Sequence, residues 1–154
     1  VLLGGVNADE IPALVQLAQD GKYEVRFIEL MPIGECADWP RERFLSADAV
    51  LHALPELQRL PNEGVAERYR MPGWKGKIGL IRPMSHRFCA DCDRIRVTAD
   101  GRLKPCLHSA QEIPLRGLHG ENLERALREV RMKRYSSASA SAAVSDSRHA
   151  SSLF

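Results

Sequence analysis

The sequence lacks long apolar segments, and its apolar runs are short, such as residues 1–3 and 27–28. A membrane-spanning helix needs about 20 apolar residues, so we expect no membrane partner. The first residues also lack the basic region and long apolar stretch of a secretory signal, so we expect a cytoplasmic protein. The chain does not begin with Met, and we interpret Val1 as an internal residue of a longer polypeptide.

A large excess of one charge is also missing. The 154 residues carry 22 Lys and Arg against 20 Asp and Glu, a net charge of +2. This charge is too small to indicate nucleic acid, and we expect no nucleic-acid partner. Between residues 82 and 104, however, six basic residues stand against three acidic ones, a local excess of +3. This segment is either a solvated basic face or a site for an anion.

Cysteine is scarce, but three of the four cysteines are clustered. Cys89 and Cys92 form a C-x2-C pair, and Cys106 follows after thirteen intervening residues. Without an export signal the thiols are expected to stay reduced, and clustered thiols then bind metal more often than they form disulfides. The pair places two sulfurs on one tight turn, and Cys106 must reach them through folding.

The apolar pattern predicts mixed α/β structure. A strand ending at residue 3, a helix over residues 11–18 and a strand over residues 25–30 form a βαβ unit, which is expected to be parallel and buried. Short strands over 57–61, 66–71 and 75–83 follow, and residues 123–130 have the spacing of an amphipathic helix.

The end of the chain has a different composition. Eight of the nineteen residues in 136–154 are serine, and such a stretch cannot bury enough apolar area to offset the entropy lost on ordering. We therefore expect a disordered tail rich in Ser and Ala over these residues.

A turn signal explains how Cys106 returns to the other two thiols. Asp100-Gly101 is typical of a two-residue hairpin loop. Strands over residues 94–98 and 102–107 would then pair and carry Cys106 back beside Cys89 and Cys92.

The spacing leaves the metal open. Structural zinc needs four protein ligands, and Cys36, His86 and His108 are candidates for the fourth. A [4Fe–4S] cluster held by three thiolates instead keeps one iron open to a substrate or cofactor. Thiols that bind nothing are the third alternative.

Two arginines follow the C-x2-C pair. Arg94 and Arg96 are two apart on a predicted strand, so both guanidiniums would project from the face beside the metal. Guanidiniums match phosphate oxygens well, so a polyphosphate is one candidate partner and an anionic cluster is another. The alternative is that they pair with Asp91, Asp93 or Asp100.

At these residues the sequence resembles the GTP 3',8-cyclase family of radical S-adenosylmethionine enzymes. The resemblance is carried by the C-terminal cluster segment, GLIRPMSHRFCADCDRIRVTADGRLKPCL, and by GGVNADEIPALVQLA and VRFIELMPIG. It implies that Cys89, Cys92 and Cys106 bind a [4Fe–4S] cluster with one iron open to guanine. It also implies that Arg94 and Arg96 bind GTP, and that Arg26 is an active-site arginine for GTP or S-adenosylmethionine. An ion pair of Arg26 with Glu24 or Glu29 is the alternative.

The resemblance also implies an α/β fold. Residues 1–34 would be the last βαβ portion of an incomplete TIM-like barrel, and residues 35–135 a small α+β region for the cluster and GTP. The family converts GTP, with S-adenosylmethionine, to 3',8-cyclo-7,8-dihydroguanosine triphosphate. The product passes to cyclic pyranopterin monophosphate synthase in molybdenum cofactor biosynthesis. A homodimer is left open as a further partner.

Three features depart from the family pattern. The C-x3-C-x2-C motif of the radical-generating cluster is absent, so this chain alone is not expected to run the reaction or to contain a catalytic residue. Asp93 stands where the family usually has Asn, and the chain ends in HASSLF in place of a Gly-Gly tail. The alternatives are an auxiliary-cluster domain of another radical enzyme, which would bind a leader peptide, and a zinc-stabilised binding module.

Overall fold

The computed structural model describes residues 1–88, 92, 94–107, 109 and 111–130. The chain divides into two compact units, Val1–Asp91 and Cys92–Phe154. No helix in the described part of the chain is long and apolar enough to cross a membrane.

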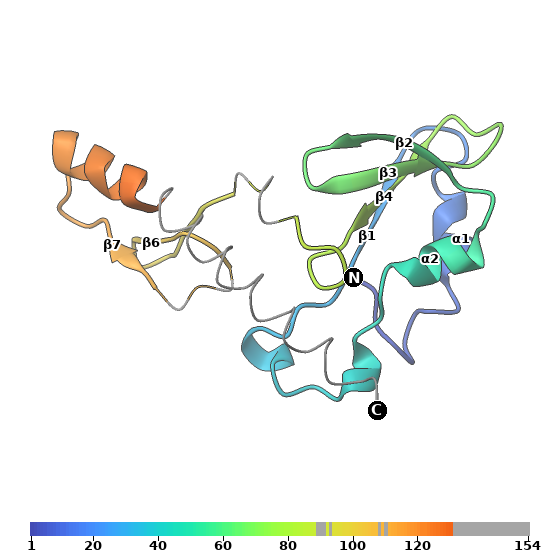
Figure 1. The fold of residues 1–154 in the computed structure, drawn as a ribbon, viewed down its shortest axis with the longest axis horizontal. Helices are drawn as coiled ribbons and strands as arrows, with labels where there is room; N and C mark the ends of the chain where they lie inside the picture. Colours follow the sequence, from blue (N-terminus) through green and yellow to red (C-terminus); the bar gives the residue numbers. More distant parts are fainter. Residues whose placement is uncertain (89–91, 93, 108, 110, 131–154) are drawn as a thin grey trace, which may run out of the picture. The chain divides into compact units, whose positions relative to one another are not determined.

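The first unit is built on a four-stranded sheet with the order β1-β4-β3-β2 (Figure 1). Strand β1 pairs in parallel with β4, whereas β3 pairs antiparallel with both β4 and β2. The strands are β1 (Glu24–Ile28), β2 (Gln58–Glu63), β3 (Ala66–Arg70) and β4 (Lys77–Ile81).

Two helices, α1 (Ile11–Gln16) and α2 (Asp48–Ala53), cover one face of this sheet (Figure 1). The short 3-10 helices η1 (Gly34–Cys36) and η2 (Arg41–Arg43) lie in the connection between β1 and α2. Alternate strand residues point to opposite faces, so the apolar ones meet the helices. The buried core contains sheet residues Phe27, Tyr69, Ile78 and Leu80 and helix residues Ile11, Val15 and Val50.

The predicted βαβ unit is confirmed at its ends. Leu2 forms a parallel bridge with Glu29, and its N–H donates to the carbonyl of Ile28 at 2.8 Å. Helix α1 ends at Gln16, two residues before the predicted end, and the chain continues through turns to β1. The three strands predicted after it appear as β2, β3 and β4. The resemblance separates residues 1–34 from residues 35–135. Because β1 pairs with β4, one sheet contains residues from both of these regions.

The second unit contains a small antiparallel sheet with the order β5-β6-β7 and a helix over residues 120–130. Its strands are β5 (Arg96–Val97), β6 (Arg102–Lys104) and β7 (Ile113–Pro114). Leu103 and Val130 are fully buried, and Ala126 is nearly so. The helix confirms the predicted amphipathic segment, whereas the Ser-rich residues 136–154 lie outside the described part of the chain.

The predicted hairpin forms, but its loop and strand lengths differ from the prediction. The Gly101 N–H donates to the Thr98 carbonyl at 2.9 Å, and the Thr98 N–H donates to the Arg102 carbonyl at 2.8 Å. The loop therefore has three residues, 99–101, and Gly101 takes the left-handed conformation with φ +81°. The prediction of a two-residue loop was wrong because Asp100-Gly101 occupies the last two positions of this longer loop. The strands are also shorter than residues 94–98 and 102–107.

Candidate functional site

Two of the three clustered cysteines can be placed. Cys92 and Cys106 are half-buried free thiols within the second unit. Cys89, the third predicted ligand, lies outside the described residues, as do His108, Asp91 and Asp93. Among the residues that are described, no group of three or more His, Cys, Asp or Glu side chains gathers at one point.

The hairpin brings the chain around Cys92 and Cys106 to the same end. Arg96 is paired with Lys104 in the antiparallel register, so the chain before β5 and the chain after β6 leave the hairpin side by side. Cys92 precedes β5 by four residues, and Cys106 follows β6 by two. A metal centre shared by these two thiols would require the two ends of the hairpin to leave it on the same side.

The same register gathers basic side chains on one face of the small sheet. Arg96 lies directly opposite Lys104, and Arg102 alternates with Lys104 on β6, so all three share a face. Arg102 pairs with Asp100 at 2.8 Å and approaches Glu112 at 3.8 Å. Lys104 approaches Glu112 at 3.6 Å.

Arg96 is the cation on this face that lacks a counter-ion among the described residues. Like charges directly opposite one another on a sheet repel, so Arg96 beside Lys104 favours an anion. The predicted alternative, a pair with Asp100, is wrong for Arg96 because Asp100 binds Arg102. Arg94 is exposed, precedes β5 rather than lying within it, and already has a partner in the chain.

Arg26 lies in the first unit, in the middle of β1. Its side chain is 43% exposed, and its Nε donates to Glu24 Oε1 at 2.6 Å. The expected alternative, an ion pair with Glu24, is therefore present, whereas Glu29 bonds elsewhere. Among the described side chains, no partner is seen for the two terminal nitrogens of Arg26, which remain available to a ligand.

Glu29 is a buried carboxylate whose structural role was not predicted from the sequence. It follows β1 directly and accepts hydrogen bonds from the backbone N–H groups of Ala47 at 3.0 Å and of Met84 and Ser85 at 2.9 Å each. The Ser85 hydroxyl also donates to it. Burial alone would raise the pKa of Glu29, but these hydrogen bonds outweigh burial and lower it. The charged carboxylate thus joins the chain before α2 to the loop that leads to Cys89.

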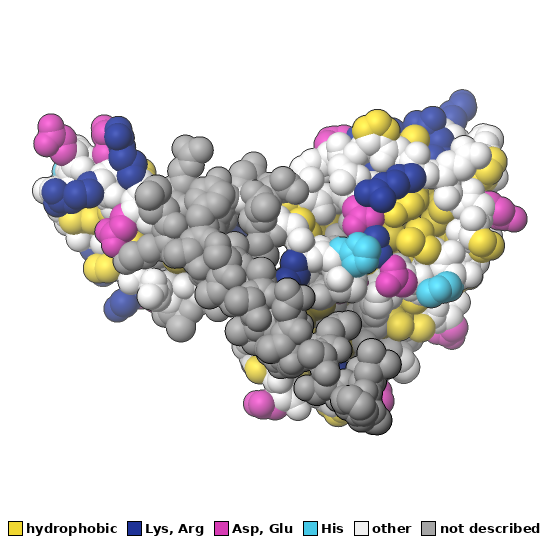
Figure 2. Space-filling view, viewed as in Figure 1, with side chains coloured by type: hydrophobic (Ala, Val, Ile, Leu, Met, Phe, Trp, Pro, Cys, Tyr) yellow, Lys and Arg dark blue, Asp and Glu magenta, His cyan; other side chains and the backbone are white. Residues whose placement is uncertain are grey.

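Arg82 is the second buried charge, and it follows β4 directly. Its Nε and Nη2 donate to the two carboxylate oxygens of Glu67 at 3.1 and 2.7 Å, and its Nη1 pairs with Asp48. The hydrogen bond from Arg82 is the largest cause of the lowered pKa of Glu67. Figure 2 shows acidic, basic and histidine side chains side by side on this unit. A charged residue at the end of an apolar strand is the sequence signal that points to both Glu29 and Arg82.

His86 and Cys36, two candidates for a fourth zinc ligand, lie in the first unit. His86 is exposed and reaches Glu67 at 3.8 Å, and Cys36 is a half-buried free thiol in η1. Both residues therefore belong to the first unit, whereas Cys92 and Cys106 belong to the second.

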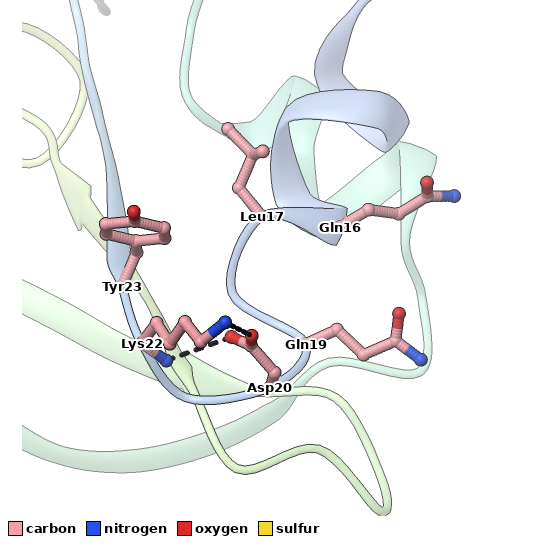
Figure 3. Close-up of a pocket in the computed structure, with 6 residues that line it drawn as sticks. All are labelled: Gln16, Leu17, Gln19, Asp20, Lys22 and Tyr23. Carbon is pink, nitrogen blue, oxygen red and sulfur yellow. Dashed lines mark hydrogen bonds and ion pairs between the residues drawn. The ribbon is translucent and has the colours of Figure 1, made fainter.

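A shallow pocket lies at the opposite, amino end of β1 (Figure 3). Two of its lining residues, Lys22 and Asp20, form an ion pair of 3.2 Å. The other lining residues are Gln16, Leu17, Gln19 and Tyr23. In parallel α/β sheets ligands bind at the carboxyl ends of the strands, so this pocket lies at the edge where a ligand of the sheet is not expected.

Comparison with known proteins shows the family of the chain. The sequence model of the Molybdenum Cofactor Synthesis C family matches residues 23–140. The chain belongs to this family. The match begins one residue before β1 and includes the sheet, the hairpin and all four cysteines.

Individual relatives support the resemblance to GTP 3',8-cyclases. The GTP 3',8-cyclase of Alkaliphilus oremlandii is 48% identical over 117 residues, which cover 75% of this chain and 37% of that protein. The one from Peptoclostridium acidaminophilum is 49% identical over 121 residues, with 76% and 37% covered. The one from Clostridium botulinum strain Hall is 39% identical over 124 residues, with 79% and 39% covered. The chain thus spans less than two fifths of these relatives.

The Glu29 network makes a prediction about acid stability. Because the folded-state pKa of Glu29 lies below its unfolded value, its stabilisation is complete above the unfolded pKa and is lost as pH falls through the folded pKa. We expect the unfolding free energy to fall as pH drops below about 4.5, and Glu29→Gln to cost about 2–3 kcal/mol at pH 7 and to flatten this dependence. Urea unfolding from pH 7 to pH 3 measures both effects. Glu56→Gln, in the exposed turn after α2, is the control, and an equal loss in that variant would contradict the assignment.

The hairpin makes a second prediction. Gly101→Val forces a β-branched residue into the left-handed region, which displaces the loop that returns Cys106. Gly117→Val imposes the same strain at φ +78° outside the hairpin. After reconstitution with iron and sulfide, we expect Gly101→Val to retain less than half of the iron and Gly117→Val to retain it, as measured by iron per chain. Equal iron in the two variants would show that the loop is not needed to gather the thiols.

Proposed function

We propose that this chain is the C-terminal part of a GTP 3',8-cyclase that holds a [4Fe–4S] cluster and binds GTP. Cys89, Cys92 and Cys106 would hold the cluster, and Arg94 and Arg96 would bind the nucleotide. The observation that carries the proposal is the hairpin, which returns Cys106 toward Cys92 and leaves Arg96 opposite Lys104 without a counter-ion among the described residues. The family match over residues 23–140 supports the same assignment.

The second unit contains donor atoms that suit a metal. Thiolates are soft ligands that suit iron–sulfur clusters and zinc, and Cys92 and Cys106 are both free. Among the described residues of this unit, Leu103, Ala126 and Val130 are buried apolar side chains. A metal centre joins segments that are separate in the sequence, so a cluster would supply stability as well as function.

The chain's own residues would contribute orientation and electrostatics. When bound, the cluster would supply an open iron to which guanine coordinates. Arg94 and Arg96 would engage the charged part of GTP with paired N–H donors, and Lys104 on the same face would strengthen the attraction. Arg26 would bind GTP or S-adenosylmethionine through its terminal nitrogens, because Glu24 occupies its Nε. Positioning of this kind lowers the entropic part of a reaction barrier.

The complete reaction needs more than this chain. The four cysteines lack C-x3-C-x2-C spacing, so the cluster that reduces S-adenosylmethionine must be held elsewhere. The full enzyme would convert GTP to 3',8-cyclo-7,8-dihydroguanosine triphosphate in the cytoplasm, as a step of molybdenum cofactor synthesis. Its product would pass to cyclic pyranopterin monophosphate synthase. We infer that the chain alone is inactive in this reaction.

Anaerobic reconstitution with iron and sulfide tests the proposal. We expect a brown chain with about four irons, whose cluster spectrum changes when GTP is added. Cys106→Ser should lose most of the iron, whereas the matched control Cys36→Ser, a free thiol in η1, should keep it.

The competing metal and substrate assignments predict different results in the same assay. A colourless chain with one zinc, lost on changing His86 or Cys36, would contradict the proposal and favour a zinc-stabilised module. A cluster that responds to a peptide and not to GTP would contradict it in favour of another radical enzyme.

Arg96 makes a further prediction. Because it has no ion pair in the described structure, Arg96→Ala should leave thermal stability unchanged and weaken GTP binding about tenfold, the loss expected for a charge-assisted phosphate contact. Arg125→Ala removes an exposed arginine from the helix over residues 120–130 and serves as the control. Calorimetric titration with GTP measures both variants. Equal weakening in the two variants would contradict a specific contact, because it would mean that Arg96 contributes only its positive charge.

A further inference from the structure

We propose that Glu24, Arg68 and Gly79 are positioning residues that hold the Arg26 guanidinium in place for its ligand. This inference rests on the role proposed above for Arg26. These residues lie on neighbouring strands, and Arg26 pairs with Gly79, which in turn pairs with Arg68. All of them lie on the charged face of the sheet, which is the face opposite the helices and carries Glu24, Arg26, Arg68, Arg70 and Lys77.

Gly79 provides the space that the Arg26 side chain occupies. A Cβ atom built on Gly79 would lie 2.9 Å from Arg26 Cγ and 3.6 Å from Arg26 Cδ. The aliphatic stem of Arg26 therefore lies across the backbone of β4. Glycine weakens a strand interior and often marks a close approach, and the approaching group at this position is Arg26.

Glu24 fixes the other end of the side chain. Its Oε1 accepts from Arg26 Nε at 2.6 Å, and its Oε2 lies 3.4 Å from Nη2 of Arg68. Arg68 is anchored in turn, since its side chain is 14% exposed and its Nη1 pairs with Glu63. Glu24 is thus held from β3 while it holds Arg26 on β1.

This arrangement leaves the binding atoms of Arg26 free. Its stem is set by Gly79 and its Nε by Glu24, and the two terminal nitrogens have no partner among the described residues. A guanidinium fixed in this way loses less rotamer entropy when it binds an anion, so affinity rises without a new contact. A simple structural ion pair would instead use the terminal nitrogens that Arg26 leaves open.

Replacing Glu24 gives a test in which two explanations predict opposite changes in the affinity for GTP. Glu24→Gln removes a negative charge near a polyanion, so electrostatics alone would tighten GTP binding. If Glu24 positions Arg26, the same change weakens GTP binding by about fivefold, because the amide oxygen of Gln holds Arg26 Nε less strongly than a carboxylate does. Calorimetric titration of the reconstituted chain with GTP measures whether the affinity rises or falls. Asp20→Asn, which removes an exposed carboxylate paired with Lys22, is the charge-matched control.

Gly79→Ala separates positioning from stability. The group that must move is the flexible Arg26 side chain, so we expect thermal stability to stay within a few degrees of the native value. GTP binding should nevertheless weaken by several-fold. Both variants are then repeated in an Arg26→Ala background, where we expect neither change to weaken binding further.

The outcomes distinguish this inference from the proposed function. Weakening by Glu24→Gln and Gly79→Ala that disappears in Arg26→Ala, with Asp20→Asn unchanged, supports the positioning role. Native or tighter binding in Glu24→Gln, while Arg26→Ala is weakened, overturns the positioning role alone. Native GTP binding in Arg26→Ala removes the GTP role of Arg26 and this inference with it. Absence of GTP binding by the unaltered chain contradicts the proposed function itself.

Discussion

The parallel pairing of β1 with β4 is the constraint on which the first unit depends. It joins residues about fifty positions apart, and its register places Arg26 over Gly79 and Glu29 beside the loop after β4. Both buried charges, Glu29 and Arg82, stand directly after these two strands. A shift of one residue would turn Arg26 toward the helices and the apolar residues toward the charged face. The pairing therefore fixes the core and the charged residues together.

Local signals in the sequence predicted much of the fold. Apolar spacing indicated helix α1 and the strands of the first unit, and Asp100-Gly101 indicated the hairpin, because both signals depend on neighbouring residues. Local signals do not contain pairing between distant strands, so the position of β4 between β1 and β3 was not predicted. The Glu29 and Arg82 networks were not predicted for the same reason, since the partners of each residue come from two segments of the chain that are distant from it and from each other.

The candidate site was predicted to a different extent in the two units. In the second unit, residue type and spacing pointed to Cys92, Cys106 and Arg96; the hairpin between them forms, and their ligand roles stay predictions. In the first unit, the sequence offered Glu24 or Glu29 as an ion-pair partner for Arg26, as the alternative to a role in ligand binding. The structure separates them, because Glu29 is satisfied by backbone donors and Glu24 faces the same side as Arg26. Charges near the site thus divide into those that hold the fold and those that remain open to a ligand.

The central claim is that three thiolates of this chain hold a cluster with one iron open to GTP. Mössbauer spectroscopy of the chain reconstituted with 57Fe tests this claim most directly, because it resolves the individual irons. The account predicts that one iron of about four changes its isomer shift when GTP is added, while the others keep theirs. Four irons that stay unchanged at saturating GTP, or a single iron in a mononuclear thiolate site, would contradict it.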